Sequence, residues 1–258
     1  MAHLKDLDLL PDGLVAVLGV GSTARGWGNE SSDLNFYVIS AEPWTRAGVP
    51  AKSAPLVPSA VPVTTARVDG TRWKLKHWSE GQVAQMLAKV TWERFTARTG
   101  DASPLTEIEE LFLERLESAV PVVGGDWLAA RRDQAAASAF RAFSSLGSTR
   151  AAERSSRDAL DRLRADDPHG AVLTARQAFG HAVDAYLDSR GNHGTFTPKW
   201  RARRVAETPP ACLPFDRYWA LETAARLDPD RPAAWVHEVV DACAALLAET
   251  GTPSAPAR

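Results

Sequence analysis

A glycine-serine turn after an apolar run constrains the fold of this chain more than any other feature. The segment from Leu14 to Leu18 is apolar, as is typical of a buried strand, and it leads into Gly19-Val20-Gly21-Ser22-Thr23-Ala24-Arg25-Gly26. Glycine and serine allow backbone N–H groups to come close to a ligand with no side chain between them. The turn therefore predicts a cradle for an anionic group.

A second strand begins twelve residues after Gly21, with the sequence Asp33-Leu34-Asn35-Phe36-Tyr37-Val38. Because side chains alternate along a strand, Asp33 and Asn35 share one face beside the turn. Two carboxylates at these positions would help to hold two metal ions. In this chain the second position carries an amide instead.

The spacing resembles the signature of the nucleotidyltransferase superfamily to which kanamycin nucleotidyltransferase belongs. That signature has a Gly-Ser turn, a loop, and then Asp-x-Asp or Asp-x-Glu on a strand. The residues of this chain that fit it are Gly21, Ser22, Arg25, Gly26, Ser32 and Asp33. The family's third acidic position lies on a later strand, and the sequence there is Asp69-Gly70-Thr71-Arg72-Trp73-Lys74-Leu75. The resemblance thus implies a degenerate metal site, with Asn35 and Lys74 in place of two carboxylates.

The charge of these side chains argues against a site for two metal ions. Mg²⁺ takes oxygen ligands, and a two-metal site needs several carboxylates. The ammonium of Lys74 would repel a divalent ion, and we expect it to pair with Asp33 instead. We therefore take Asp33, Asn35 and Lys74 as the candidate catalytic residues and expect no cofactor. Under an alternative interpretation, Asp33 and Asn35 hold one Mg²⁺.

Composition favours a small-molecule substrate. The chain has 258 residues, 45% of them hydrophobic, which is enough for one large domain or two modest ones. Its formal net charge of −2 gives no basic surplus for binding nucleic acid. No apolar window reaches the length of about eighteen residues that a membrane span needs, and the N-terminal sequence lacks the apolar core of a signal peptide. We expect a cytoplasmic protein with no membrane partner, and the oligomeric state stays open.

The periodicity predicts strands in the first part of the chain and helices in the second. The resemblance then implies an α+β fold, in which a mixed sheet with flanking helices is followed by a helical bundle. Asp69-Gly70 is a strong hairpin signal, and the proline-rich segment from 43 to 62 is expected to be a long loop. The expected strands are Leu14–Val20, Leu34–Ser40, Val61–Val68 and Arg72–Trp78. A helix begins after the N-cap at Ser79, and the later ones are expected at Leu105–Leu116, Trp127–Phe143, Arg150–Leu163 and Val172–Leu187.

Two glycines at 124 and 125 interrupt the helical pattern, and we place the domain boundary there. The expected division is a nucleotidyltransferase-like domain over residues 1–123, a helical domain over 124–250 and a disordered tail over 251–258. The second part looks like the helical substrate-binding domain of small-molecule nucleotidyltransferases. On this resemblance, His181 and Asp184 line the substrate site and Lys199 reaches a triphosphate. The alternative is that these three side chains belong to solvated faces.

Three functions compete on this evidence. In the first interpretation, the chain is an enzyme that has lost two-metal nucleotidyl transfer and uses Asp33 and Lys74 for another reaction on a small molecule. Alternatively, it still transfers a nucleotidyl group from a nucleoside triphosphate, with Mg²⁺, to a hydroxyl of an aminoglycoside-like, antibiotic-related molecule. In the third interpretation it is a noncatalytic protein that binds a small molecule or a nucleotide. Gly21, Ser22 and Arg25 are expected to bind the phosphate or substrate.

Overall fold

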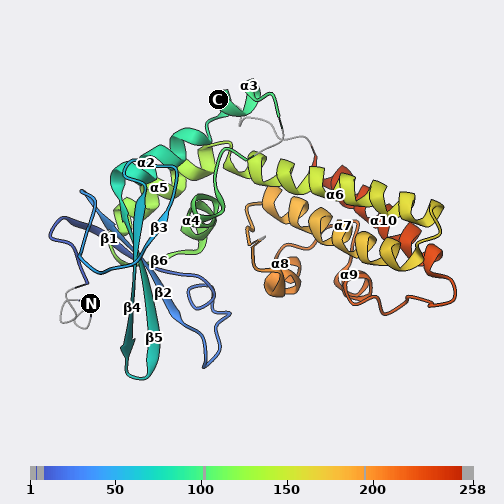
Figure 1. Ribbon diagram of the computed structural model, residues 1–258, viewed down its shortest axis with the longest axis horizontal. Helices are drawn as coiled ribbons and strands as arrows, with labels where there is room; N and C mark the ends of the chain where they lie inside the picture. Colours follow the sequence, from blue (N-terminus) through green and yellow to red (C-terminus); the bar gives the residue numbers. More distant parts are fainter. Residues whose placement is uncertain (1–3, 5–8, 101–102, 195, 252–258) are drawn as a thin grey trace. The chain divides into compact units, whose positions relative to one another are not determined.

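The computed structural model describes residues 4, 9–100, 103–194 and 196–251 (Figure 1). They form two compact units, the first from residues 1–94 and 104–138 and the second from residues 95–103 and 139–258. The tail expected over residues 251–258 lies outside the described residues, apart from Gly251.

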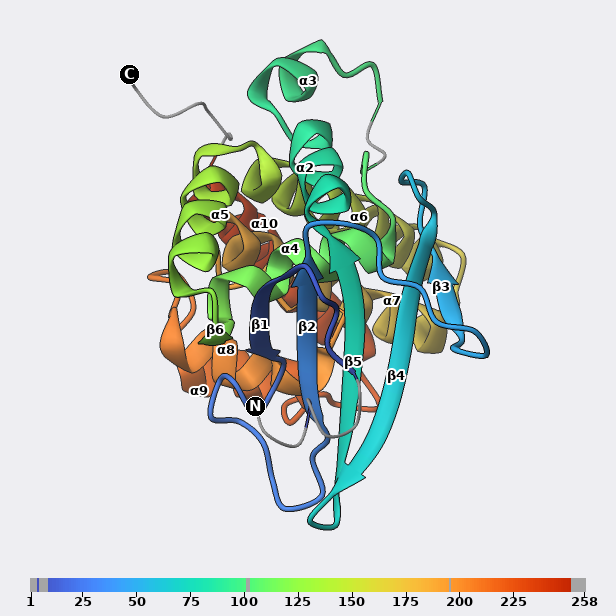
Figure 2. The same ribbon diagram turned by 90° about the vertical axis from the view of Figure 1, so that its left-hand side faces the viewer.

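The first unit is built on a six-stranded mixed sheet with the strand order β3-β4-β5-β2-β1-β6, which can be followed across Figure 2. The strand β2 runs antiparallel to β1 and parallel to β5, and β5 runs antiparallel to β4. The strands are β1 (Leu14–Val20), β2 (Leu34–Ser40), β3 (Ala51–Ser53), β4 (Ala60–Val68), β5 (Thr71–Ser79) and β6 (Val120–Val123). The mixed sheet expected from the sequence is confirmed.

The hairpin between β4 and β5 turns at Asp69 and Gly70, as predicted. Both residues have a positive φ, 50° and 80°, which is the conformation that a two-residue hairpin turn with native twist requires. The proline-rich segment is not entirely a loop, because Ala51–Ser53 pairs with the edge of β4. Three exposed residues carry no alternating pattern of their own, so only the partner strand reveals β3.

The two faces of the sheet have different cover. On one face, the ring of Phe112 stacks on Tyr37 at 4.9 Å between centroids and meets the edge of Trp78 at 5.0 Å. On the other face, Leu4 packs in a core with Val17 and residues of β2 and β5. The helices of this unit are α2 (Glu80–Lys89), α4 (Glu107–Ser118) and α5 (Gly125–Ala137), and α3 (Trp92–Ala97) lies where the chain passes between the units.

The boundary between the units differs from the one expected at Gly124. Strand β6 pairs with β1, and Gly124 then brings α5 directly against Val15 and Ala16, so α5 belongs with the sheet. Helix α5 ends at Ala137, and a new helix begins at Phe140, which corrects the expected helix Trp127–Phe143. Ser138 and Ala139 have non-helical or irregular backbone there, and the alanine-rich sequence gives no sign of the break.

The second unit is helical, as expected. The helices α6 and α10 both pack on α7, whose buried side carries five alanines and a glycine that let the helices come close. The elements are α6 (Phe140–Arg164), α7 (Pro168–Ser189), the short 3₁₀ helix η1 (Pro198–Trp200), α8 (Arg201–Glu207), α9 (Phe215–Glu222) and α10 (Pro232–Thr250). In the part of the chain that the structure describes, every helix is too short or too polar to cross a membrane.

The close approach at Gly124 generates a stability prediction. Gly124 has φ +78°, and a Cβ there would lie 2.5 Å from the Val15 carbonyl oxygen and 2.6 Å from Ala16 Cβ. Gly124→Ala is expected to lower the free energy of unfolding by about 2 kcal/mol or more. The strain of an alanine in the left-handed backbone conformation and the steric clash of its Cβ both contribute to this loss. Urea denaturation measures the change.

Gly125→Ala is the matched control. A Cβ at Gly125 meets no atom within 4 Å, and the residue begins α5, so this variant is expected to be neutral or slightly stabilising. Equal losses in the two variants would show that the approach of α5 to β1 does not depend on Gly124.

Candidate functional site

The sheet brings the glycine-serine turn, Asn35 and Lys74 to adjacent positions. Val20 at the end of β1 pairs with Asn35 on β2, and Asn35 pairs with Lys74 on β5. Gly21 has φ +83°, and a Cβ built on it would lie 3.8 Å from Asn35 Nδ2. Three of the residues singled out from the sequence therefore meet at one edge of the sheet.

The turn itself presents backbone donors. Its internal hydrogen bonds use the amides of Arg25, Gly26 and Trp27, which donate to the carbonyl oxygens of Gly21, Thr23 and Ser22 in that order. Among the described residues, no hydrogen bond joins the amides of Ser22, Thr23 or Ala24 to another group. These successive N–H groups are available to an anion.

Asp33 pairs with Arg72 rather than with Lys74, which corrects the pairing expected from the sequence. Arg72 donates Nε–H to Asp33 Oδ1 at 2.9 Å, and its Nη2 donates to Oδ2. The Arg72 hydrogen bond is the main cause that holds the pKa of Asp33 below its usual range, against a smaller effect of desolvation, and Lys74 adds a weaker attraction. Both carboxylate oxygens are thus engaged, at a partly exposed position.

The donor set at this edge does not fit Mg²⁺. The side chains at this end of the sheet are Asp33, whose oxygens bind Arg72, the amide of Asn35 and the ammonium of Lys74. A cation next to one carboxylate and one amide repels a divalent ion instead of binding it. Within the described residues, no group of three His, Cys, Asp or Glu side chains is arranged to hold a metal.

A second lysine lies on the same face, which the sequence-based candidate list missed. Lys76 follows Lys74 by two residues and pairs with Tyr37 on β2, so both lysines face α4, whose Phe112 stacks on Tyr37. Lys76 is only 7% exposed. The alternation of side chains along the expected strand Arg72–Trp78 places Lys76 on the same face as Lys74, so the sequence could have indicated it.

Arg25 lies beside the end of α4. Its Nε donates to Ser118 Oγ at 3.1 Å, and its guanidinium lies 4.7 Å from the centroid of the Trp27 ring. These contacts hold the guanidinium at the end of α4, where helix carbonyl groups favour a cation. Arg25 thus joins the turn to α4 and adds positive charge to this part of the first unit.

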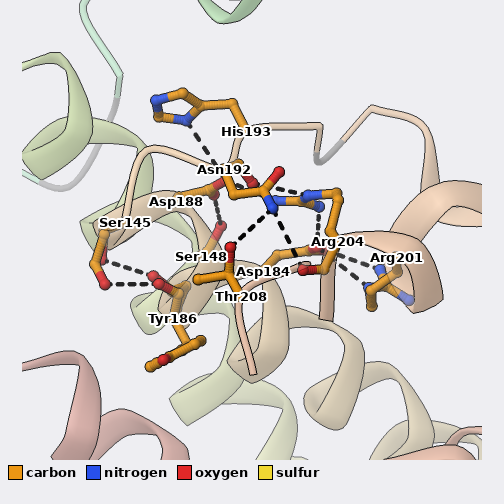
Figure 3. A network of polar contacts seen from close by, with 12 residues as sticks. Ser145, Ser148, Asp184, Tyr186, Asp188, Asn192, His193, Arg201, Arg204 and Thr208 are labelled. Atoms are coloured by element: carbon orange, nitrogen blue, oxygen red, sulfur yellow. Dashed lines mark hydrogen bonds and ion pairs between the residues drawn. The ribbon is translucent and has the colours of Figure 1, made fainter. Parts of the chain in front are cut away.

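The polar residues predicted on the second unit belong to a different arrangement. Asp184 is 1% exposed, and its carboxylate accepts from Arg201 Nη2 at 2.8 Å and from Arg204 Nη1 at 2.8 Å (Figure 3). Arg204 is fully buried and also binds Asp188 at 3.1 Å. Asp184 is therefore neither solvated nor open to a substrate, and its role in the second unit is structural.

The two remaining candidates of this unit have different surroundings. His181 is partly buried, and burial is the main cause that lowers its pKa, with Asp184 opposing the effect and Arg201 reinforcing it. Lys199 is exposed, and its ammonium lies 5.0 Å from the centroid of the Trp200 ring. A cation over an indole ring is a common surface contact. Neither residue is joined by a hydrogen bond to the ionic cluster around Asp184.

No family model and no curated protein sequence matches this chain. Among solved structures, the chain is similar to a nucleotidyltransferase-like protein from Exiguobacterium sibiricum 255-15, at 15% sequence identity and a TM-score of 0.49. The match covers 96% of this chain and 72% of that chain. We transfer no residue role from it, because a likeness this remote leaves the side chains of a site undetermined.

The pair of Asp33 and Arg72 predicts a titration change. In Arg72→Gln the pKa of Asp33 is expected to rise toward the ordinary value of 3.8, because the main cause of its depression is gone. A carbon-detected NMR titration of the Asp33 carboxyl group measures this pKa. Arg67→Gln, on the neighbouring strand and hydrogen-bonded to Gly70, is the control and should leave the titration unchanged.

The lowered pKa of Asp33 also determines how the stabilisation by the Asp33–Arg72 pair changes with pH. Because the pKa of Asp33 is lowered in the folded state, the stabilisation by Arg72 is fully present above the unfolded-state pKa of 3.8. It is lost as the pH falls through the lower folded-state pKa. A stability difference between wild type and Arg72→Gln that grows as the pH falls below about 4 would contradict the assignment.

The buried ionic cluster predicts a large loss of stability. Arg204→Met leaves Asp184 and Asp188 buried with one cation fewer, so the free energy of unfolding is expected to fall by about 3 to 5 kcal/mol. Arg164→Met, which removes an exposed partner of Asp161, is the control and should cost less than about 1 kcal/mol. Urea denaturation compares the two, and similar losses would mean that Arg204 is not holding the cluster together.

Proposed function

We propose that the first unit binds the anionic group of a small molecule at the edge formed by Gly21, Asn35 and Lys74, and acts on it without a metal ion. The observation that carries the proposal is the position of Lys74, opposite Asn35 in the parallel pairing of β2 and β5. A fixed ammonium there supplies the positive charge that a metal ion would otherwise bring to a phosphate.

The surroundings of Lys74 support an anionic ligand. Ser22, Thr23 and Ala24 offer backbone N–H groups at the end of β1. Arg25 and Lys76 add positive charge on the side of the sheet that faces α4. Backbone donors together with lysine and arginine side chains are a common combination for binding phosphate groups.

We further propose that the ligand is a small molecule of the kind that nucleotidyltransferases handle, with a nucleoside triphosphate as the first compound to test. The Gly-Ser turn followed by the strand with Asp33 is the sequence pattern that suggests it. Asp33, bound to Arg72, would then orient the cationic edge instead of binding metal. A reaction on the bound molecule separates an enzyme from a binding protein.

Calorimetric titration tests the binding step. ATP and tripolyphosphate are each titrated into the full chain with EDTA present, and Lys74→Ala is expected to weaken binding about tenfold, the loss of roughly one charge-assisted hydrogen bond. Arg226→Ala removes an exposed positive charge from the second unit and is the matched control. Its affinity should equal that of the wild type.

The other outcomes separate the competing functions. Binding that requires Mg²⁺ and is indifferent to Lys74→Ala would overturn the proposal and favour metal-dependent nucleotidyl transfer. Phosphorus NMR of the bound nucleotide, with and without an aminoglycoside, then detects turnover. Metal-free binding with no change in the phosphorus signals would point to a noncatalytic binding protein.

A further inference from the structure

Lys76 differs from an ordinary surface lysine in its burial and in its partners. It lies in the middle of β5 and is 7% exposed. Within the described part of the chain, no hydrogen bond and no salt bridge joins its ammonium to another residue. Burial of most of this side chain with no carboxylate bound to it disfavours the charged ammonium, which favours the neutral amine.

The groups around Lys76 are mostly cationic. Lys74 lies two positions along the same strand face, about 7 Å away by strand geometry. Tyr37 is the cross-strand neighbour, with its hydroxyl donating to the Leu111 carbonyl oxygen at 3.4 Å. The charged groups that act on Lys76 are Arg115 and Glu107 of α4, Lys52 of β3 and Lys74 of β5.

These surroundings lower the pKa of the Lys76 amine toward neutral pH. Burial is the main cause that lowers the pKa of Lys76 to about 8, and Arg115, Lys52 and Lys74 lower it further, while Glu107 opposes them weakly. At pH 7.5 about a quarter of such side chains are neutral, against about 0.1% for a lysine with the ordinary pKa. A desolvated lysine next to another cation is a known way of preparing a nucleophile.

We propose that Lys76 is a nucleophilic amine that forms an imine with a small aldehyde or ketone carrying a carboxylate or phosphate group. Lys74 and Arg115 would hold the anionic group, and this half of the inference rests on the proposed function. The nucleophilic half stands on the burial and the unpaired amine of Lys76 alone.

The chemistry balances without a cofactor. The neutral Nζ attacks the carbonyl carbon, a C–N bond forms, and the carbonyl oxygen takes up a proton to give a carbinolamine. The nitrogen then loses its second proton and the hydroxyl group leaves as water, which gives a C=N bond. The net change is amine plus carbonyl compound to imine plus water. Cyanoborohydride delivers hydride to the imine carbon and fixes the product as a secondary amine.

Reductive labelling of the full chain tests the proposal with two matched probes, 4-carboxybenzaldehyde and the neutral 4-formylbenzamide. The lysines of the chain are Lys5, Lys52, Lys74, Lys76, Lys89 and Lys199, so peptide mass spectrometry can follow each of them. At pH 7.5, Lys76 is expected to be labelled about tenfold faster than Lys52 and Lys199, because a larger neutral fraction outweighs its lower basicity.

The pH profile is a second readout. Labelling of Lys76 should be half-maximal near pH 8, whereas labelling of an exposed lysine should continue to rise toward pH 10. In Lys74→Met the midpoint of Lys76 is expected to move upward, because a neighbouring positive charge is gone. Lys76→Arg keeps the charge and should abolish the fast phase of labelling while Lys199 reacts as before.

Each outcome bears on one half of the inference. The proposal that Lys76 is a nucleophile is wrong if Lys76 is labelled no faster than Lys52 and Lys199. It is also wrong if the labelling of Lys76 has its midpoint near pH 10. If Lys76 is labelled fast but at the same rate by the two probes, the result supports Lys76 as a nucleophile and contradicts the proposal that its substrate is anionic. The titration of tripolyphosphate in EDTA tests the anion site independently, so failure of the nucleophile is distinguished from failure of the proposed function.

Discussion

The parallel pairing of β2 with β5 is the constraint on which the candidate site depends. It places Asn35 beside Lys74 and Tyr37 beside Lys76, while the antiparallel pairing of β1 with β2 brings the glycine-serine turn to the same edge. A shift of one residue in either pairing would send these side chains to the opposite face. The register is secured from both sides, because α4 packs on Tyr37 and the apolar core around Val17 covers the other face.

The charge balance at this edge is the reason for proposing an anionic ligand rather than a metal ion. The one carboxylate among the three key positions is neutralised by Arg72, and Lys74 leaves the edge with an excess of positive charge. A lysine ammonium is always present and does not have to be bound first, as a metal ion does. It lacks the coordination geometry and the Lewis acidity of Mg²⁺. The imine formation proposed for Lys76 needs no metal ion, so it is compatible with a cationic edge.

The second unit shows the opposite use of charge. Arg204 and the two aspartates of α7 are almost fully buried (Figure 3). They bind one another, and further hydrogen bonds join them to Arg201, Ser148 and the Asn192 carbonyl oxygen. Removing such charges from water is expensive, and only complete pairing offsets the cost. The cluster therefore fixes α8 against α7. In the described part of the first unit, by contrast, no hydrogen bond or salt bridge joins the ammonium of Lys74 or Lys76 to another residue. This contrast separates a structural ionic cluster from a candidate site more clearly than residue type does.

The sequence by itself determined four of the strands, β1, β2, β4 and β5, together with the hairpin at Asp69 and Gly70. It also determined the helical second half and the meeting of Gly21 with Asn35. Local alternation and turn chemistry act over a few residues, so they can be read without the fold. The tertiary structure decided the partner of Asp33, the burial of Asp184 and the burial of Lys76 with no carboxylate bound to it. Each of these depends on groups from distant segments. It also decided the strand β6 and the break before α6, since pairing with β1 and packing on the sheet override weak local preferences.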